Sequence, residues 1–103
     1  LEPQASAAAW KKIEAVITRN DPYCRGVVLL GLEAPLAELE VAFAATADAT
    51  VVKGFAVGRS IFAHAAEEWM AGRMNDQAAI DDMAQRFEQL TKAWLAARDR
   101  RAA

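Results

Sequence analysis

Two apolar runs constrain this chain more than any other feature of its sequence. They cover residues 26–32 and 51–57, and in neither run do apolar and polar residues alternate. Runs of this length without alternation, with Lys53 as the one charged residue, predict short strands covered on both faces, as in a parallel sheet. Between the runs, apolar side chains at helical spacing predict a helix that starts at residues 33–35, with Pro35 near its first position, and ends near residue 48. The order therefore predicts one strand–helix–strand unit with parallel strands and a crossover helix.

Three further helices are predicted around this unit. Ser6 is expected to cap a first helix that reaches about residue 19. A short helix is predicted over residues 61–71 and ends at Gly72, and Asn75 is expected to cap a long last helix over residues 76–98. We expect the charged tail, residues 98–101, to fray. The fold class is therefore α/β, with two complete parallel strands and about four helices.

Two strands leave two open sheet edges and too little sheet to cover four helices. We therefore interpret residues 1–103 as one unit, the C-terminal part of a (β/α)8 barrel. Such barrels bind phosphate after their last strands, beside a short extra helix. The alternative is a small α/β domain that completes its sheet by oligomerising. The opening Leu1-Glu2-Pro3 has no methionine, which predicts an excised piece of a longer protein.

The corner after the second run is the predicted anion site. Gly58, Arg59 and Ser60 lie between the end of the strand and the start of the short helix. A helix N-terminus presents unpaired N–H groups and partial positive charge to a phosphate. Gly58 would let the ligand approach the backbone, and Arg59 could bind it with two hydrogen bonds. An ordinary strand–helix connection with a surface arginine is the alternative interpretation.

Composition excludes several classes of partner. The net charge of −2 argues against the basic surface that binds nucleic acid. No apolar run is long enough for a membrane span. The single cysteine, Cys24, excludes an internal disulfide and favours a reducing compartment, so we predict a cytoplasmic protein without a secretory leader. One histidine, one cysteine and scattered carboxylates lack the spacing of metal ligands. Neither a metal nor a cofactor is predicted.

Two motifs carry a resemblance to a known family. They are CRGVVLLGLEAP at residues 24–35 and VVKGFAVGRSIF at residues 51–62, followed by Glu68-Trp69. Both resemble the C-terminal end of a bacterial domain of unknown function that is fused behind the sugar kinase of inositol breakdown, 5-dehydro-2-deoxygluconokinase. More distantly, residues 58–62 resemble the Gly-Arg-Asn-Ile-Phe corner of barrel class I aldolases, which holds a substrate phosphate. Ser60 stands where those aldolases have asparagine.

The resemblance implies an aldolase-like barrel domain of myo-inositol catabolism. The implied reaction of the full-length protein is cleavage of 2-deoxy-5-keto-gluconate 6-phosphate to dihydroxyacetone phosphate and malonate semialdehyde. Class I chemistry needs a lysine that forms a Schiff base with the substrate ketone. The resemblance places that lysine just upstream of Leu1, so the 103-residue chain alone is expected to be inactive. The expected ligand is a phosphorylated sugar acid or another small phosphorylated substrate.

The remaining candidate residues lie at strand ends. Gly31 and Glu33 follow the first strand at its C-terminal end, where barrel chemistry is found, and are predicted substrate contacts. Glu2 would lie at the same end of the preceding strand and is expected to contact or support the substrate. Lys53 falls at the N-terminal end of its strand, which favours an ion pair over catalysis. His64 is interpreted as a surface histidine on the short helix.

Three hypotheses for the function follow. The first is an aldolase fragment with its phosphate site at residues 58–60. The second is a non-catalytic barrel that retains the anion pocket and regulates or scaffolds a fused carbohydrate kinase. The third is an independent interaction domain that forms a homo-oligomer through exposed strand edges.

Overall fold

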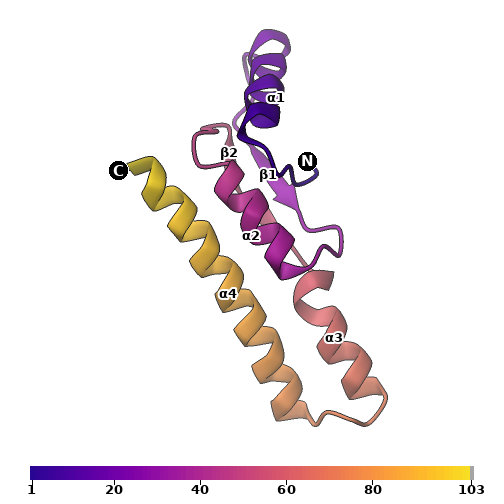
Figure 1. The fold of residues 1–103 in the computed structure, drawn as a ribbon. Coiled ribbons are helices and arrows are strands. Elements are labelled where there is room, and N and C mark those ends of the chain that lie inside the picture. The colour runs from indigo at the N-terminus through magenta and orange to yellow at the C-terminus, as the bar shows by residue number, and fades with distance from the viewer. Residues whose placement is uncertain (103) are drawn as a thin grey trace.

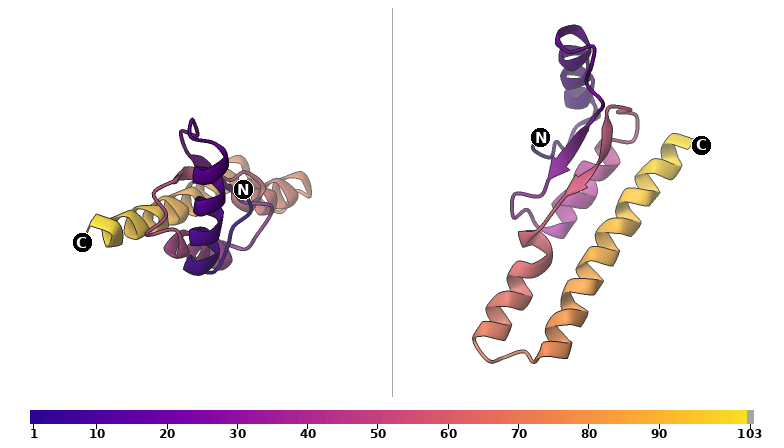
Figure 2. Two further views of the ribbon diagram at one scale, coloured as in Figure 1. Left: turned by 90° about the horizontal axis from the view of Figure 1, so that it is seen from above. Right: turned by 180° about the vertical axis from the view of Figure 1, so that it is seen from behind.

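The computed structural model describes residues 1–102 (Figure 1). A layer of helices packs on one face of a two-stranded sheet, with α2 on the strands and α4 along α2 (Figure 2). The helices α3 and α4 form a hairpin that extends beyond the sheet (Figure 1). In chain order the elements are α1 (Ala7–Asn20), β1 (Val27–Leu30), α2 (Leu36–Ala45), β2 (Val52–Ala56), α3 (Arg59–Met70) and α4 (Asp76–Ala102).

The helix boundaries follow the local signals of the sequence. Ser6 caps α1, because its hydroxyl accepts from the N–H groups of Ala8 and Ala9 at 3.2 and 3.4 Å. The Asn75 side chain caps α4 in the same way, accepting from Ala78 N at 2.8 Å. Gly72 follows α3 in the left-handed conformation, with φ of +76°. These three predictions are confirmed.

The strands β1 and β2 pair in parallel, as predicted. The register places Leu29 beside Phe55 and Leu30 beside Ala56, with an irregularity between Val27 and Val28. Leu1 lies along the other edge of β1: its backbone nitrogen donates to Val28 O and its carbonyl accepts from Leu30 N, both at 2.9 Å. These two bonds have the pattern of a parallel pairing.

The core lies between the sheet and its helices. Leu29 and Val52 from the strands, Leu39 and Phe43 from α2, and Leu90 from α4 are fully buried. An aromatic cluster extends this core, since the ring centroid of Phe43 lies 4.9 Å from that of Phe55 and 5.6 Å from that of Trp94. At the amino end of the sheet, Trp10 of α1 joins the same core. The burial of α2 against both strands holds them in parallel.

The prediction of a (β/α)8 barrel fragment is wrong. Within residues 1–102 the chain forms a two-stranded sheet that is not part of a closed barrel. The strands are also not covered on both faces, because Val28 and Leu30 remain 43% and 40% exposed. The missing alternation in the first run therefore reflects an apolar face that is open, and not a second covering layer.

The last helix extends past its predicted end at residue 98. The helix α4 continues to Ala102, and Arg98 joins it to the body of the molecule. The Arg98 guanidinium donates to the carbonyls of Thr46 and Val52 and to the Thr46 hydroxyl, at 3.0, 3.2 and 2.6 Å. It also stacks on the Trp94 ring at 4.0 Å. The side chain of Arg98 thus connects α4 to the end of α2 and the start of β2.

We predict that Arg98→Ala lowers the free energy of unfolding by about 2 kcal/mol, because it removes these hydrogen bonds and the stacking on Trp94. Arg86→Ala is the control: Arg86 pairs with Asp82 within α4, and its loss should cost at most about 0.5 kcal/mol. Urea unfolding followed by circular dichroism measures both. Equal midpoints for the two variants would contradict the role given to Arg98.

Candidate functional site

The parallel strands bring two loops together at their carboxyl edge. After β1 the chain enters a loop that begins at Gly31, and after β2 it enters the corner at Gly58. The ladder continues one step into the first loop, because Gly31 N donates to Ala56 O at 3.2 Å. A Cβ atom on Gly31 would lie 2.9 Å from Val57 Cγ1, so glycine is needed for this close packing. The loops are therefore neighbours in space although they are far apart in the sequence.

The loop after β1 is strained. Leu32 and Glu33 both have positive φ, at 50° and 63°, which is a conformation that residues other than glycine rarely adopt. A turn holds them there, with Ala34 N donating to Gly31 O at 2.9 Å. Backbone strain of this kind tends to occur at ligand-binding sites, where the surrounding structure maintains it. Here it projects the carboxylate of Glu33 toward the start of α3.

An ion pair joins the two loops. Arg59 Nη1 lies 2.9 Å from Glu33 Oε1, and the two side chains are 56% and 58% exposed. Exposed pairs of this kind contribute little to stability, because water screens both charges. The Glu33 carboxylate is therefore held only weakly against Arg59. The pair shows that an anionic group fits against Arg59 at this corner.

A hydrogen bond from Ser60 joins the start of α3 to the loop after β1. Its hydroxyl donates to Ala34 O at 2.7 Å, so that proton is used within the protein. The first N–H groups of α3 that bond within the helix are those of Ile61 and Phe62, both to Gly58 O. The N–H groups of Arg59 and Ser60 precede this ladder and have no partner within the helix. They are the backbone donors that an anion could use.

Gly58 has a packing role. Its φ is −123°, outside the left-handed region, so its conformation does not require glycine. A Cβ atom there would lie 3.2 Å from Phe62 Cε1, which is tighter than ordinary contact. The absent side chain therefore makes room for the Phe62 ring and leaves the backbone of the corner accessible.

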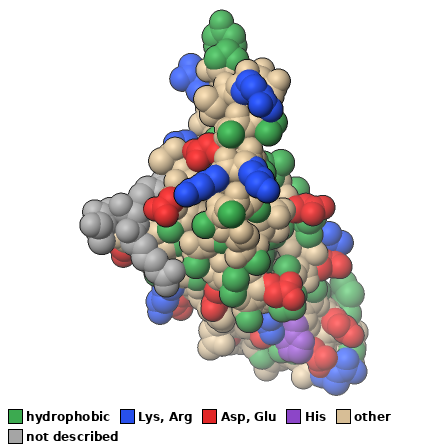
Figure 3. Space-filling model, turned by 45° about the horizontal axis from the view of Figure 1, so that its top comes forward, with side chains coloured by type: hydrophobic (Ala, Val, Ile, Leu, Met, Phe, Trp, Pro, Cys, Tyr) green, Lys and Arg blue, Asp and Glu red, His purple; other side chains and the backbone are tan. Residues whose placement is uncertain are grey.

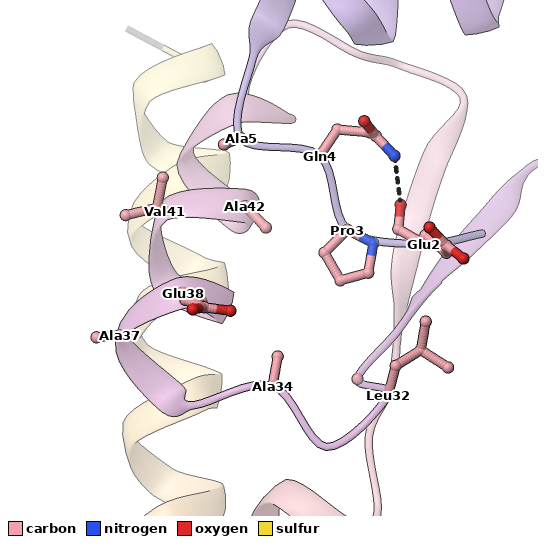
Figure 4. A pocket seen from close by; sticks show the side chains of 11 residues that line it. Glu2, Pro3, Gln4, Ala5, Leu32, Ala34, Ala37, Glu38, Val41 and Ala42 are labelled. Atoms are coloured by element: carbon pink, nitrogen blue, oxygen red, sulfur yellow. Dashed lines mark hydrogen bonds between the residues drawn. The ribbon is translucent and has the colours of Figure 1, made fainter.

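A pocket of about 480 Å³ lies on the α2 side of the same loop (Figure 4). The N-terminal segment forms one wall, and Gln4 Nε2 donates to Glu2 O at 3.5 Å. The Glu38 side chain points from α2 toward the pocket (Figure 4). The pocket lining is mostly apolar and includes two glutamates. The lining residues are Glu2, Pro3, Gln4, Ala5, Gly31, Leu32, Ala34, Ala37, Glu38, Val41 and Ala42.

The predicted site residues fall into two adjacent groups. Glu33, Arg59 and Ser60 gather at the corner, whereas Glu2 and Gly31 line the pocket. The loop after β1 lies between the groups and contributes to both. Neither Lys53 nor His64 belongs to them. Lys53 lies at the amino end of β2, where its side chain packs against Gly26, and His64 is exposed on α3.

A glutamate with a lowered pKa lies away from this site. Arg73, after α3, donates to Glu68 at 2.6 and 3.2 Å, and this hydrogen bonding lowers the pKa of the Glu68 carboxyl. Among residues 1–102, no group of three or more His, Cys, Asp or Glu side chains could hold a metal ion. On the face drawn in Figure 3, acidic and basic side chains are interspersed.

Two features of the site were missed from the sequence. Glu38 lies in the first turn of α2 and lines the pocket. The sequence carries a signal for it, because a helix predicted to start near Pro35 has Glu38 in its first turn. The positive φ of Leu32 and Glu33 has no such signal, because neither residue type favours that conformation.

The chain matches the model of one protein family. The match covers residues 1–98, and the family is described as an uncharacterized protein conserved in bacteria, DUF2090. Comparisons with curated proteins and with solved structures give no match. None of the helices described over residues 1–102 has the length and hydropathy that crossing a bilayer requires.

We predict that Leu32→Gly raises the free energy of unfolding by up to about 1 kcal/mol, because glycine adopts positive φ without strain. Leu32→Ala is the matched control, since it removes the same exposed side chain but keeps the Cβ atom and therefore the strain. Thermal unfolding measured by calorimetry compares the two variants. The strain would be refuted if the glycine variant were no more stable than the alanine variant.

Proposed function

The chain belongs to the DUF2090 family of bacterial proteins, and on that premise we propose that the carboxyl edge of its two strands binds the phosphate group of a phosphorylated sugar acid. The observation that carries the proposal is the pairing of Arg59 with Glu33 at 2.9 Å, beside the free N–H groups that start α3. An arginine that already holds a carboxylate at a helix N-terminus has the geometry needed for an anion.

Phosphate competes well for this arginine. It carries more negative charge than a carboxylate and accepts two parallel hydrogen bonds from a guanidinium. The N–H groups of Arg59 and Ser60 add donors that the Glu33 side chain does not use. Glu33 is therefore the internal competitor of the ligand: it occupies Arg59 in the free protein and is displaced when phosphate binds.

The adjacent pocket takes the carbon chain of the ligand. A sugar acid has several hydroxyl groups, and carboxylates are acceptors for them. Glu38 points its carboxylate toward the pocket, which Glu2 also lines, and the loop containing Gly31 connects the pocket to the proposed phosphate site. Binding at both places orients the ligand along the loop after β1. Gly31, Glu33, Gly58, Arg59 and Ser60 are thus assigned to the ligand or to its immediate support.

The proposed reaction of the full-length protein is aldol cleavage of 2-deoxy-5-keto-gluconate 6-phosphate within myo-inositol catabolism. It rests on the resemblance to the domain fused to 5-dehydro-2-deoxygluconokinase and on the phosphate corner described here. Lys53 lies at the opposite end of its strand from Arg59, so this chain supplies binding groups and not the Schiff-base lysine. We place the reaction in the cytoplasm, in keeping with the single free Cys24.

A second candidate function is regulation or scaffolding of a carbohydrate kinase without catalysis. It would use the same corner at Arg59 without a Schiff-base lysine, and Lys53 lies at the opposite end of β2 from that corner. Borohydride reduction of the full-length protein in the presence of the substrate separates the two functions. A covalent adduct supports the aldolase, and its absence from protein that binds the substrate supports the regulatory role.

We predict that Arg59→Ala weakens binding of 2-deoxy-5-keto-gluconate 6-phosphate roughly ten- to a hundredfold, because charged hydrogen bonds to the phosphate are lost. Glu33→Gln should have the opposite effect and strengthen binding, since it removes the competing carboxylate. Titration calorimetry measures both dissociation constants.

Arg73→Ala is the matched control for this experiment. Arg73 is as exposed as Arg59 and also pairs with one glutamate, but it lies at the far end of α3. Its replacement should leave the dissociation constant unchanged. If Arg59→Ala and Arg73→Ala had equal effects, phosphate binding at the corner would be ruled out.

A further inference from the structure

The outer side of α4 carries an apolar stripe that no other part of the described chain covers. Ile80, Phe87 and Leu95 are each 54% exposed, although all three are large apolar side chains. Ala84 and Thr91 lie between them, so the stripe repeats at intervals of three and four residues. This spacing places all five side chains on one side of the helix. Here we call these five residues the outer stripe.

The outer stripe continues into a groove beside it. The groove has a volume of about 470 Å³ and lies between α3 and α4, and Ile80 belongs to both surfaces. Trp69 and Met70 of α3 are 49% and 78% exposed along it. An apolar surface of this extent on a projecting helical hairpin is typical of a site where another helix packs.

The charges of α4 are divided between its two halves. Residues 76–88 contain four acidic residues and one arginine, whereas the sequence of residues 89–102 contains four basic residues and one aspartate. The first half therefore has a net charge of −3 and the second half +3. Two such helices repel each other when they run in parallel and attract each other when they run antiparallel.

We propose that α4 pairs antiparallel with α4 of a second copy of this chain, through the outer stripe. A two-fold axis beside Phe87 brings Ile80 of each copy against Leu95 of the other, because seven and eight residues separate these two from Phe87. The same axis brings Ala84 against Thr91. The apolar pattern and the charge pattern therefore share one centre of symmetry.

This shared centre argues for a second copy over a different protein. An isologous interface requires one surface to be complementary to itself, and a helix selected for another partner has no reason to meet that condition. In this register Asp81 of one copy approaches Lys92 of the other, at both ends of the interface. At the centre, Glu88 is paired with Lys92 of its own chain at 3.0 Å, which limits repulsion between the two copies of Glu88.

Sedimentation equilibrium of the full chain tests the proposal. The wild type should associate reversibly to a dimer that weakens as salt is added, because opposite charges contribute to it. Phe87→Asp should weaken dimerisation about tenfold or more, since it places two carboxylates at the centre. Val41→Asp is the control, because Val41 has the same 54% exposure on α2 and lies outside the stripe.

Two further variants keep the test decisive if Phe87→Asp also impairs folding. Phe87→Cys in a Cys24→Ser background should form a disulfide between copies on mild oxidation, whereas Val41→Cys in that background should not. Asp81→Lys should also weaken the dimer, because it brings two lysines together at each end of the interface. A chain that stays monomeric at all concentrations, or a dimer insensitive to Phe87→Asp and uncrosslinked at position 87, overturns the proposal and leaves the stripe to a different protein.

Discussion

The parallel pairing of β1 and β2, enforced by the burial of α2, is the constraint on which the rest of the structure depends. Leu39 and Phe43 of α2 are fully buried against Leu29 and Val52 of the strands. Because parallel strands end at the same edge, the loops that follow them become neighbours. The ion pair between Arg59 and Glu33 exists only because of this topology. An antiparallel pairing would have placed these residues at opposite ends of the sheet.

The long helix α4 stabilises the pairing of the strands with α2 through the side that faces α2. Leu90 and Ala97 are buried, and the Arg98 side chain bonds to the backbone at the end of α2 and the start of β2. These contacts occupy one side of the helix. The outer stripe lies on another side of α4, so internal packing and the proposed dimer use different residues of the helix. The proposed phosphate site lies at the start of α3, and α3 packs against α4.

Much of the fold could be predicted from local chemistry. Caps such as Ser6 and Asn75 and the glycine after α3 act within one turn of helix, so the sequence alone specifies them. The parallel unit followed from two apolar runs and an intervening helix. The barrel prediction failed because a strand with an exposed apolar face has the same sequence pattern as a strand covered on both faces. Val28 and Leu30 therefore looked buried on both sides although they are not.

The candidate site was predictable in part for the same reason. Glu33 and Arg59 could be named from their positions after two strands, but their contact is a consequence of tertiary structure. The Ser60 hydroxyl donates to Ala34 O, and this bond could not be predicted because the two residues are far apart in the sequence. The positive φ at Leu32 and Glu33 is imposed by the turn against the usual preference of both residues. Tertiary contacts of this kind have no local signature.

Nuclear magnetic resonance of the isotope-labelled chain, titrated with inorganic phosphate, tests most directly whether the carboxyl edge is an anion site. The account predicts that the amide signals of Glu33, Arg59 and Ser60 shift together along one saturation curve and that Arg59→Ala abolishes this response. Shifts that scatter over the surface, or that persist in the folded Arg59→Ala variant, would contradict it.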